Sequence, residues 1–271
     1  LGDVYKRQLP YFVCRRFSPT RSTRKIAGQI AGHFAPVPLR ETDITETALT
    51  DEIHMGHNEL LIVGVPVYAG RIPALAANSI RHIKGEATPA ILFCTYGNRD
   101  YDDALLELKE LVEQNGFKPV SAAAFIAQHS IFPALAANRP DTSDRQQIDR
   151  FATESGKLLE EIESTENLSE IPVKGNHPYK VAKAIPLIPR SGRRCNRCGA
   201  CARLCPTHAI DPDNPRKTDK DKCISCAHCI ALCPQQARHF GGILYRIATH
   251  KFVAAHSDRK EPDLLFAPPE K

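Results

Sequence analysis

The sequence has no apolar run long enough to cross a bilayer: the longest, such as residues 60–67, fall far short of the roughly 20 residues of a membrane helix. It shows no charged segment followed by an apolar stretch and small residues, the pattern of a secretory leader. Cysteine is scarce in the first 190 residues, which hold only Cys14 and Cys94, both in apolar runs typical of buried, inert thiols. We therefore expect a soluble, cytoplasmic protein with reduced thiols.

The other eight of the ten cysteines form two identically spaced runs. These are Cys195-x-x-Cys198-x-x-Cys201-x-x-x-Cys205-Pro206 and Cys223-x-x-Cys226-x-x-Cys229-x-x-x-Cys233-Pro234. This is the bacterial spacing for two [4Fe-4S] clusters, in which the fourth cysteine of each run ligates the other cluster. The prediction is one cluster on Cys195, Cys198, Cys201 and Cys233, and a second on Cys223, Cys226, Cys229 and Cys205.

Structural zinc and disulfides are the alternatives for these cysteines. Zinc sites normally use two separated Cys pairs or Cys/His pairs rather than four closely spaced cysteines followed by proline. Disulfides conflict with a reduced compartment. The run spacing therefore favours iron-sulfur clusters and a role in electron transfer.

Residues 9–163 alternate apolar strands with helical patterns. We expect strands at 9–14, 60–65, 90–95 and 121–125, and helices at 24–34, 73–83, 102–115 and 142–162, with Gly116 as a helix C-cap. Apolar strands that alternate with helices predict an α/β fold, with a doubly wound parallel sheet covered on both faces. Ligands of such sheets bind outside the carboxyl ends of the strands.

Three loops at those strand ends carry residues suited to a ligand. The first, residues 18–23, offers hydroxyls and backbone N–H groups at a helix start, which suits either a phosphate or an ordinary N-cap by Ser22 or Thr23. The second and third, residues 66–73 and 95–99, each place a tyrosine near a glycine. Two such loops beside a phosphate loop indicate a flat ring held at the edge of the sheet.

These motifs carry a resemblance to a known family. Residues 17–25 (FSPTRSTRK), 66–73 (PVYAGRIP), 95–104 (TYGNRDYDDA) and both cysteine runs resemble the flavodoxin-ferredoxin fusion proteins, or ferrodoxins, of anaerobic bacteria and archaea. The resemblance covers residues 9–266. It implies a flavodoxin-like sheet followed by a small α+β two-cluster ferredoxin domain.

The resemblance also implies FMN as a cofactor beside the two clusters. Its phosphate would lie on the loop of Ser18, Thr20, Arg21, Ser22 and Thr23. The ring would lie among Pro66, Val67, Tyr68, Tyr96, Gly97 and Asn98, with Ala69, Gly70 and Thr95 as further cofactor-binding residues. Tyr68 and Tyr96 would flank it, because the chain contains no tryptophan.

Arg21 departs from the family pattern, which has glycine at this position of the phosphate loop. If the backbone there requires positive φ, an arginine is strained, and its side chain could crowd the loop or bind the phosphate. Arg15 and Arg16 are also unusual in a strand expected to be buried.

The remaining segments give the expected domain boundaries. Residues 1–8, which are highly charged, are expected to be an artefact or disordered, and residues 9–163 form the flavodoxin-like domain. Residues 164–190, rich in proline but with apolar residues to bury, are an ordered connector. Residues 191–240 form the cluster domain and 241–271 a C-terminal helix and tail; the helix packs on the protein or, alternatively, contacts a membrane.

The net charge of +5 is unevenly distributed, with eleven Lys or Arg and four Asp between residues 180 and 222. This basic segment either offsets negative clusters or docks an acidic redox partner, such as a ferredoxin or a reductase. Aromatic residues do not interleave with the basic ones, which argues against nucleic acid. Three functions remain open: an electron carrier, which we favour, an FMN-dependent reductase of a small acceptor such as a quinone, and a redox-sensing subunit without FMN.

Overall fold

The computed structural model describes residues 12–35, 37–46, 48–162, 165, 168–183 and 185–268. The prediction for residues 1–8 therefore lies outside the described residues. No helix within the described ranges is long and apolar enough to cross a membrane.

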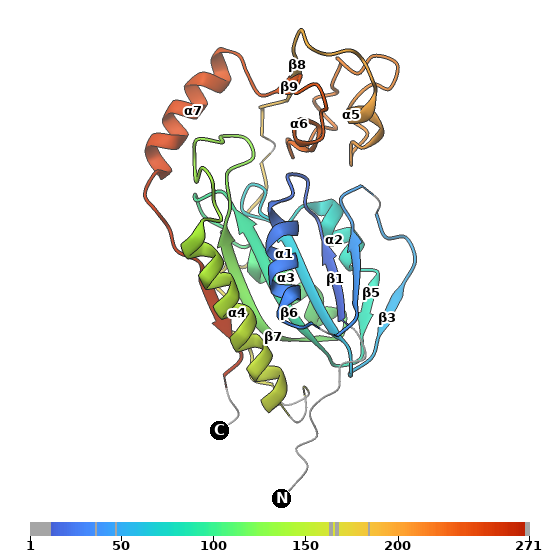
Figure 1. Ribbon diagram of the computed structural model, residues 1–271, viewed down its shortest axis with the longest axis vertical. Helices are drawn as coiled ribbons and strands as arrows, with labels where there is room; N and C mark the ends of the chain where they lie inside the picture. Colours follow the sequence, from blue (N-terminus) through green and yellow to red (C-terminus); the bar gives the residue numbers. More distant parts are fainter. Residues whose placement is uncertain are drawn as a thin grey trace, which may run out of the picture.

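The helices and strands alternate along most of the chain (Figure 1). The strands are β1 (Phe12–Arg16), β2 (Leu39–Asp43), β3 (Ile53–Met55), β4 (Leu60–Pro66), β5 (Ile83–Gly85), β6 (Thr88–Tyr96), β7 (Phe117–Ile126), β8 (Arg190–Ser191), β9 (Arg238–His239) and β10 (Asp263–Phe266). The helices are α1 (Ser22–Gly32), α2 (Ala74–Ile80), α3 (Ala104–Gln114), α4 (Thr142–Glu161), α5 (Ala200–Arg203), α6 (His228–Ala231) and α7 (Ile243–His256).

The main sheet has the strand order β2-β1-β4-β6-β7-β10. Its first five strands are parallel, and in chain order they follow the 2-1-3-4-5 arrangement of flavodoxin-like folds. The expected α/β class and doubly wound sheet are confirmed. β2 and β10 were not expected; β2 is an edge strand with exposed residues, so the apolar pattern does not mark it.

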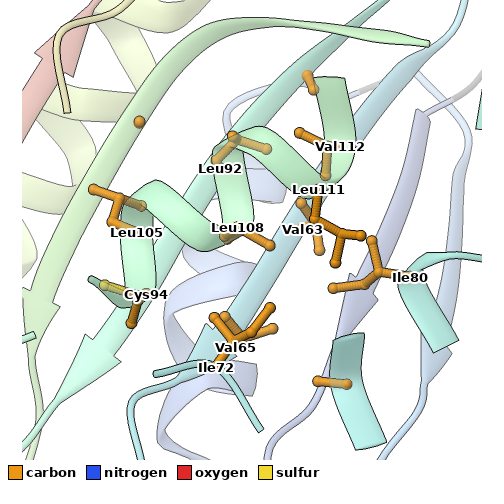
Figure 2. Packing of buried hydrophobic residues seen from close by; sticks show 14 of the residues in the cluster. Val63, Val65, Ile72, Ile80, Leu92, Cys94, Leu105, Leu108, Leu111 and Val112 are labelled. Atoms are coloured by element: carbon orange, nitrogen blue, oxygen red, sulfur yellow. The ribbon is translucent and has the colours of Figure 1, made fainter. Parts of the chain in front are cut away.

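Two apolar layers enclose the sheet. One lies between the sheet and α2 and α3, where Leu105, Leu108, Leu111 and Val112 of α3 lie in one cluster with Val63, Leu92 and Cys94 of the strands (Figure 2). The other lies between the sheet and α1 and α4. Because both faces are covered, the central strands β4 and β6 are apolar almost throughout.

β1 ends later than predicted and includes both unusual arginines, whereas residues 9–11 of the predicted strand lie outside the described residues. Arg15 and Arg16 are buried. Arg16 Nη2 donates to Glu41 Oε2 on the neighbouring strand β2 at 3.1 Å, which offsets part of the cost of burying its charge.

β10 changes the expected organisation of the C-terminal segment. After α7 the chain returns to the main sheet, where β10 pairs antiparallel with β7. The cluster domain, which carries α5, α6, β8 and β9, is therefore tethered to the sheet domain at both of its ends, and Figure 1 shows it beyond one end of the sheet. The predicted tail is thus part of the sheet domain.

The connector is ordered where it is described. The Asp103 carboxylate accepts hydrogen bonds from the backbone of Asn176 and Lys180 at 2.9 and 2.6 Å. The Arg71 guanidinium lies 4.5 Å from the centre of the Tyr179 ring. These contacts fix the path of the chain from the sheet to the cluster domain.

Candidate functional site

Thiols of the two cysteine runs lie near one another. Burial raises the pKa of the Cys201 thiol, and its neighbours Cys233 and Cys195 raise it further. Burial likewise raises the pKa of Cys226 to about 12, with added contributions from Cys229, Cys205 and Cys223. Each of these two thiols has the fourth cysteine of the other run among its neighbours, and the assignment of the cysteines to two clusters stays a prediction.

We call the two sets the outer and the inner cysteine group. The outer group is Cys195, Cys198, Cys201 and Cys233, and the inner group is Cys223, Cys226, Cys229 and Cys205. Cys198 of the outer group is exposed, whereas Cys226 of the inner group is buried.

The internal repeat is visible in the backbone. Left-handed residues, with positive φ, occur in pairs 28 positions apart, the separation of Cys195 and Cys223: Arg197 and Ser225, Gly199 and Ala227, His208 and Gln236. Both runs thus bend in the same way, although only one of these six positions is a glycine. The matching backbone conformation indicates that the two runs position their cysteines in the same way.

Backbone N–H groups point at the crossing thiols. Ala209 N donates to Cys205 Sγ at 3.4 Å, and Ala237 N donates to Cys233 Sγ at 3.3 Å. A hydrogen bond from the Arg197 backbone is the main factor that lowers the pKa of Cys195. Such donors stabilise thiolate and cluster sulfur, so these residues fit an iron-sulfur cluster.

The thiols are not arranged around a single ion. Among the residues that the structure describes, no three His, Cys, Asp or Glu side chains are close enough to hold one metal ion. A zinc site would need its ligands about 2 Å from a common centre. Four cysteines without histidine are the usual ligand set of a [4Fe-4S] cluster.

A cavity of about 320 Å³, which we call the ring cavity, lies where β4 and β6 end. It is lined by Val67, Tyr68, Ala69 and Gly70 after β4 and by Tyr96 and Gly97 at the end of β6. Ile224 and Ser225, which lie between two cysteines of the inner group, line it from the cluster domain. The predicted ring-binding residues therefore face the inner group across one cavity.

A second cavity of about 220 Å³, which we call the phosphate cavity, lies next to the ring cavity. His129 and Ser130 line both cavities. Thr20 and Ser22 of the predicted phosphate loop line the phosphate cavity, together with the cationic Lys25 and Arg139. The N-cap residue Arg21 forms no side-chain cap hydrogen bond, and the first turn of α1 holds no acidic residue. Hydroxyl groups and cationic side chains at a helix start together suit a phosphate.

Hydrogen bonds shape the phosphate loop itself. Ser18 Oγ accepts from Arg24 N at 2.9 Å, and Thr23 Oγ1 lies 2.8 Å from Thr95 Oγ1 of β6. Ser18 and Thr23 therefore stabilise the conformation of the loop through these hydrogen bonds, and they do not line the second cavity. The loop is held against the strand that carries Tyr96.

Arg21 adopts the left-handed conformation, with φ 67° and ψ 0°. The backbone thus has the geometry that favours glycine, as the family pattern implies. The Arg21 side chain is exposed and is not among the residues that line the second cavity.

Two other predicted ring residues are placed differently from Tyr68 and Tyr96. Asn98 is buried, and its amide donates to the carbonyls of His256 and Asp258 at 2.7 and 2.8 Å, so it ties the loop to the end of α7. Pro66 ends β4 and does not line the ring cavity. The turn that follows has positive φ at both Ala69 and Gly70, and Tyr68 and Arg71 pair across it.

His129 is a site residue that the sequence did not reveal. Its Nδ1 accepts hydrogen bonds from the backbone of Ile131 and Phe132 at 3.1 and 3.2 Å. Burial lowers its pKa to about 4, with further lowering by Arg99 and His256. A Cβ at Gly97 would lie 2.5 Å from the His129 ring, so the glycine leaves room for the histidine. A neutral imidazole thus stands where the two cavities meet.

The C-terminal helix packs on the loop after β7, as one of the two alternatives predicted. Tyr245 and Phe252 lie in an apolar cluster with Ile131 and Phe132. Ile243, Leu244 and Ile247 of the same helix remain exposed.

Comparison with protein families matches residues 194–237 to the 4Fe-4S dicluster domain. Comparison with curated proteins gives no match. The match places a 4Fe-4S type of domain over the residues that hold both cysteine runs.

Solved structures similar to the chain include flavodoxins. Oxidised flavodoxin 1 from Bacillus cereus is 18% identical, with 54% of this chain and 97% of that chain covered and a TM-score of 0.41. Flavodoxin from Fusobacterium nucleatum bound to flavin mononucleotide is 16% identical, with 54% and 97% covered and a TM-score of 0.41. An apo NADH:FMN oxidoreductase is 17% identical, with 54% and 88% covered and a TM-score of 0.40. Such distant matches carry no argument about ligands; the flavodoxin-like fold rests on the strand order.

Proposed function

We propose that this protein is an electron-transfer relay between two [4Fe-4S] clusters and FMN. The observation that carries the proposal is the shared lining of the cavities. Ile224 and Ser225 line the ring cavity, and Ala227 and Ile230 line the phosphate cavity. All four residues lie in the second cysteine run, which supplies three thiols of the inner group. The run that would bind a cluster thus also closes the place that would bind the flavin.

The arrangement of the thiols supports an order for the relay. Tyr68 is half-buried in the ring cavity, and burial, followed by the nearby Cys226, raises its pKa well above the usual value. The inner group therefore adjoins the ring cavity. The outer group, with Cys198 exposed, would be the one to exchange electrons with a partner protein.

When bound, each cluster exchanges one electron and FMN exchanges one or two, so the flavin can collect electrons delivered singly. The chain's own residues position these groups. Tyr68 and Tyr96 would hold the ring, and Lys25 with the hydroxyls of Thr20 and Ser22 would hold the phosphate. His129 would remain neutral near pH 7, so that it would add no charge where the two cavities meet.

FMN suits the cavities better than FAD. The phosphate cavity adjoins one helix N-terminus, and no Gly-x-Gly-x-x-Gly dinucleotide turn is present in the sequence. A single terminal phosphate is what one such loop holds.

We also propose that an acidic redox partner docks at the outer group. Arg193, Arg194 and Arg197 are exposed beside it, and Arg203 Nη1 donates to the Cys198 carbonyl at 3.1 Å. Positive charge around the exposed thiol would attract a negatively charged protein and speed its encounter.

Anaerobic isolation tests the cofactor content. We expect about eight iron, eight inorganic sulfide and one FMN per chain, the content of two cubes and one flavin. Stoichiometric zinc without sulfide would refute the clusters, and clusters without flavin would favour a redox-sensing subunit.

Rapid mixing tests the relay itself. With a one-electron reductant protein, cluster absorbance should change before the flavin is reduced. A Cys198→Ser/Cys201→Ser variant, which lacks the outer cluster, should reduce its flavin at least about tenfold more slowly while binding FMN normally. An unchanged rate would refute the relay, and sustained turnover of NADH with a quinone would favour the reductase.

A further inference from the structure

Arg238 is a buried cation in the cluster domain. It lies on β9, which pairs with β8, and its side chain is 3% exposed. Its Nη1 donates to Pro215 O at 2.9 Å and to Ser191 Oγ at 3.2 Å. Its Nη2 donates to Thr218 Oγ1 at 2.7 Å and to Pro189 O at 3.2 Å. Four neutral acceptors therefore hold the guanidinium in one position.

No carboxylate balances this charge. Within the described part of the chain no acidic side chain forms an ion pair with Arg238, and its Nε is buried without a hydrogen-bond partner. A buried charge without a counter-charge is costly, so arginine is rarely found in this state. The cost would be offset if a negatively charged group bound nearby.

The two cysteine groups meet beside Arg238. Cys201 of the outer group and Cys229 of the inner group pack in one small apolar cluster. The Arg238 side chain is within hydrogen-bond reach of the Cys229 thiol, and its charge also lies near Cys201. The guanidinium thus acts on thiols from both groups.

The internal repeat sets this arginine apart. The position 28 residues earlier, equivalent in the first run, is Ile210, which is also buried. An apolar residue therefore suffices at this position of the repeat. The charge at position 238 is an addition to the repeat and not a requirement of its fold.

We propose that Arg238 is a fixed positive charge between the two clusters that raises the reduction potential of both. The inference rests on the proposed function, because both clusters must be bound. Reduction adds a negative charge to a cluster, and a fixed cation in a poorly polarisable interior stabilises that charge more than a surface cation does. Arg238 thereby favours entry of electrons into the relay.

Redox titration followed by electron paramagnetic resonance tests the proposal on the full-length protein, with iron and sulfide measured for every sample. In Arg238→Met, both potentials should become more negative, so that the ratio of reduced to oxidised cluster at a fixed potential falls at least about tenfold, equivalent to about 59 mV for one electron. Arg238→Lys keeps the charge and should change the ratio less than about threefold.

Arg203→Met is the matched control, because Arg203 is an exposed arginine bonded beside Cys198 of the outer group. It should shift the ratio less than about threefold, and only at low salt, since exposed charges are screened. The Arg238→Met shift should persist at 1 M salt.

An Arg238→Met protein with full iron content and unchanged potentials would overturn the proposal, as would a shift confined to one cluster. If the methionine variant does not assemble its clusters, the lysine variant decides, and a tenfold loss there would show that charge is not the cause. Wild-type protein without iron and sulfide would instead refute the proposed function.

Discussion

His228 Nδ1 donates a hydrogen bond to the carbonyl oxygen of Pro19 at 2.8 Å. The histidine lies between two cysteines of the inner group, and the proline lies in the phosphate loop. His228 Nε2 also lies 3.2 Å from Glu46 Oε1. The cluster domain is thus fastened directly to the loop that would hold the FMN phosphate, and Ala227 and Ile230 beside the histidine complete the phosphate cavity.

Replacing His228 should loosen this closure. In His228→Ala, loss of the bond to Pro19, about 1 kcal/mol, should speed FMN release about fivefold, because the flavin leaves only when the cluster domain moves away. Release is measured by the recovery of free-flavin fluorescence. His250→Ala on the exposed face of α7 serves as the control and should release FMN at the wild-type rate.

The iron content of the His228→Ala protein must equal that of the wild type, so that a change in FMN release is not caused by loss of a cluster. A His228→Ala protein with full clusters and unchanged FMN release would show that the contact does not control access to the flavin.

Arg21→Gly should stabilise the phosphate loop. Arg21 has φ 67° and an exposed side chain, so glycine removes a left-handed strain of about 1 kcal/mol without removing a cavity wall. The free energy of unfolding of the FMN-free protein should rise, and FMN should bind as tightly or more tightly. Arg24→Gly, in the first turn of α1, is the opposite control and should destabilise the helix by up to about 1 kcal/mol. Weaker FMN binding in Arg21→Gly would show that the guanidinium contacts the phosphate.

The sequence predicts most reliably the features that depend on residues close together in the chain. The predicted crossing of Cys205 and Cys233 follows from the spacing of the two runs, which is typical of proteins with two clusters. Positive φ at Arg21 could be considered from the sequence, because the family places glycine there. The central strands β4 and β6 were found because burial on both faces makes them apolar.

The remaining features depend on contacts between distant segments. β10 is a half-buried edge strand whose partner β7 lies far earlier in the chain, so no local pattern marks it. Asn98 was assigned to the ring, but its partners His256 and Asp258 could not be known before the helix α7 was placed. His129 had no local signature, since its role depends on Gly97 and Phe252 from other elements.

Serine at a crossing cysteine should remove the cluster of the opposite run. Cys205→Ser should resemble Cys226→Ser, because both residues belong to the inner group, and Cys233→Ser should resemble Cys198→Ser. Each variant should lose about four iron, and paramagnetic resonance of the reduced protein shows which cluster remains. A Cys205→Ser spectrum that matches Cys198→Ser would mean that the thiols do not cross over.

His129 should make stability depend on pH. Its pKa of about 4 in the folded protein lies below the unfolded value of 6.5, so the unfolded chain binds more protons between these values. The contribution is complete above pH 6.5 and is lost as pH falls toward 4, which amounts to about 2 kcal/mol between pH 7.5 and 5. Pulse proteolysis in urea under anaerobic conditions measures it. His129→Gln should flatten this dependence, whereas the exposed His208→Gln should not; equal slopes in all three proteins would exclude His129 as the cause.

Neutralising the exposed arginines of the outer group should slow electron uptake from an acidic ferredoxin. Arg193, Arg194 and Arg197 all lie near the exposed Cys198, so their replacement by glutamine removes three positive charges where a partner would dock. Exposed charges act mainly on the rate of encounter, and we expect a decrease of about tenfold at low salt that shrinks at 1 M salt, where the Debye length is about 3 Å.

Stopped-flow reduction at both ionic strengths measures this rate. A triple variant at Arg24, Arg150 and Lys157, exposed residues of α1 and α4, removes the same net charge from the sheet domain and should react at nearly the wild-type rate. Equal slowing in both triple variants would show that net charge alone matters. Wild-type kinetics at low salt in the outer-group variant would mean that its arginines only balance the charge of the clusters, and that the partner docks on another surface.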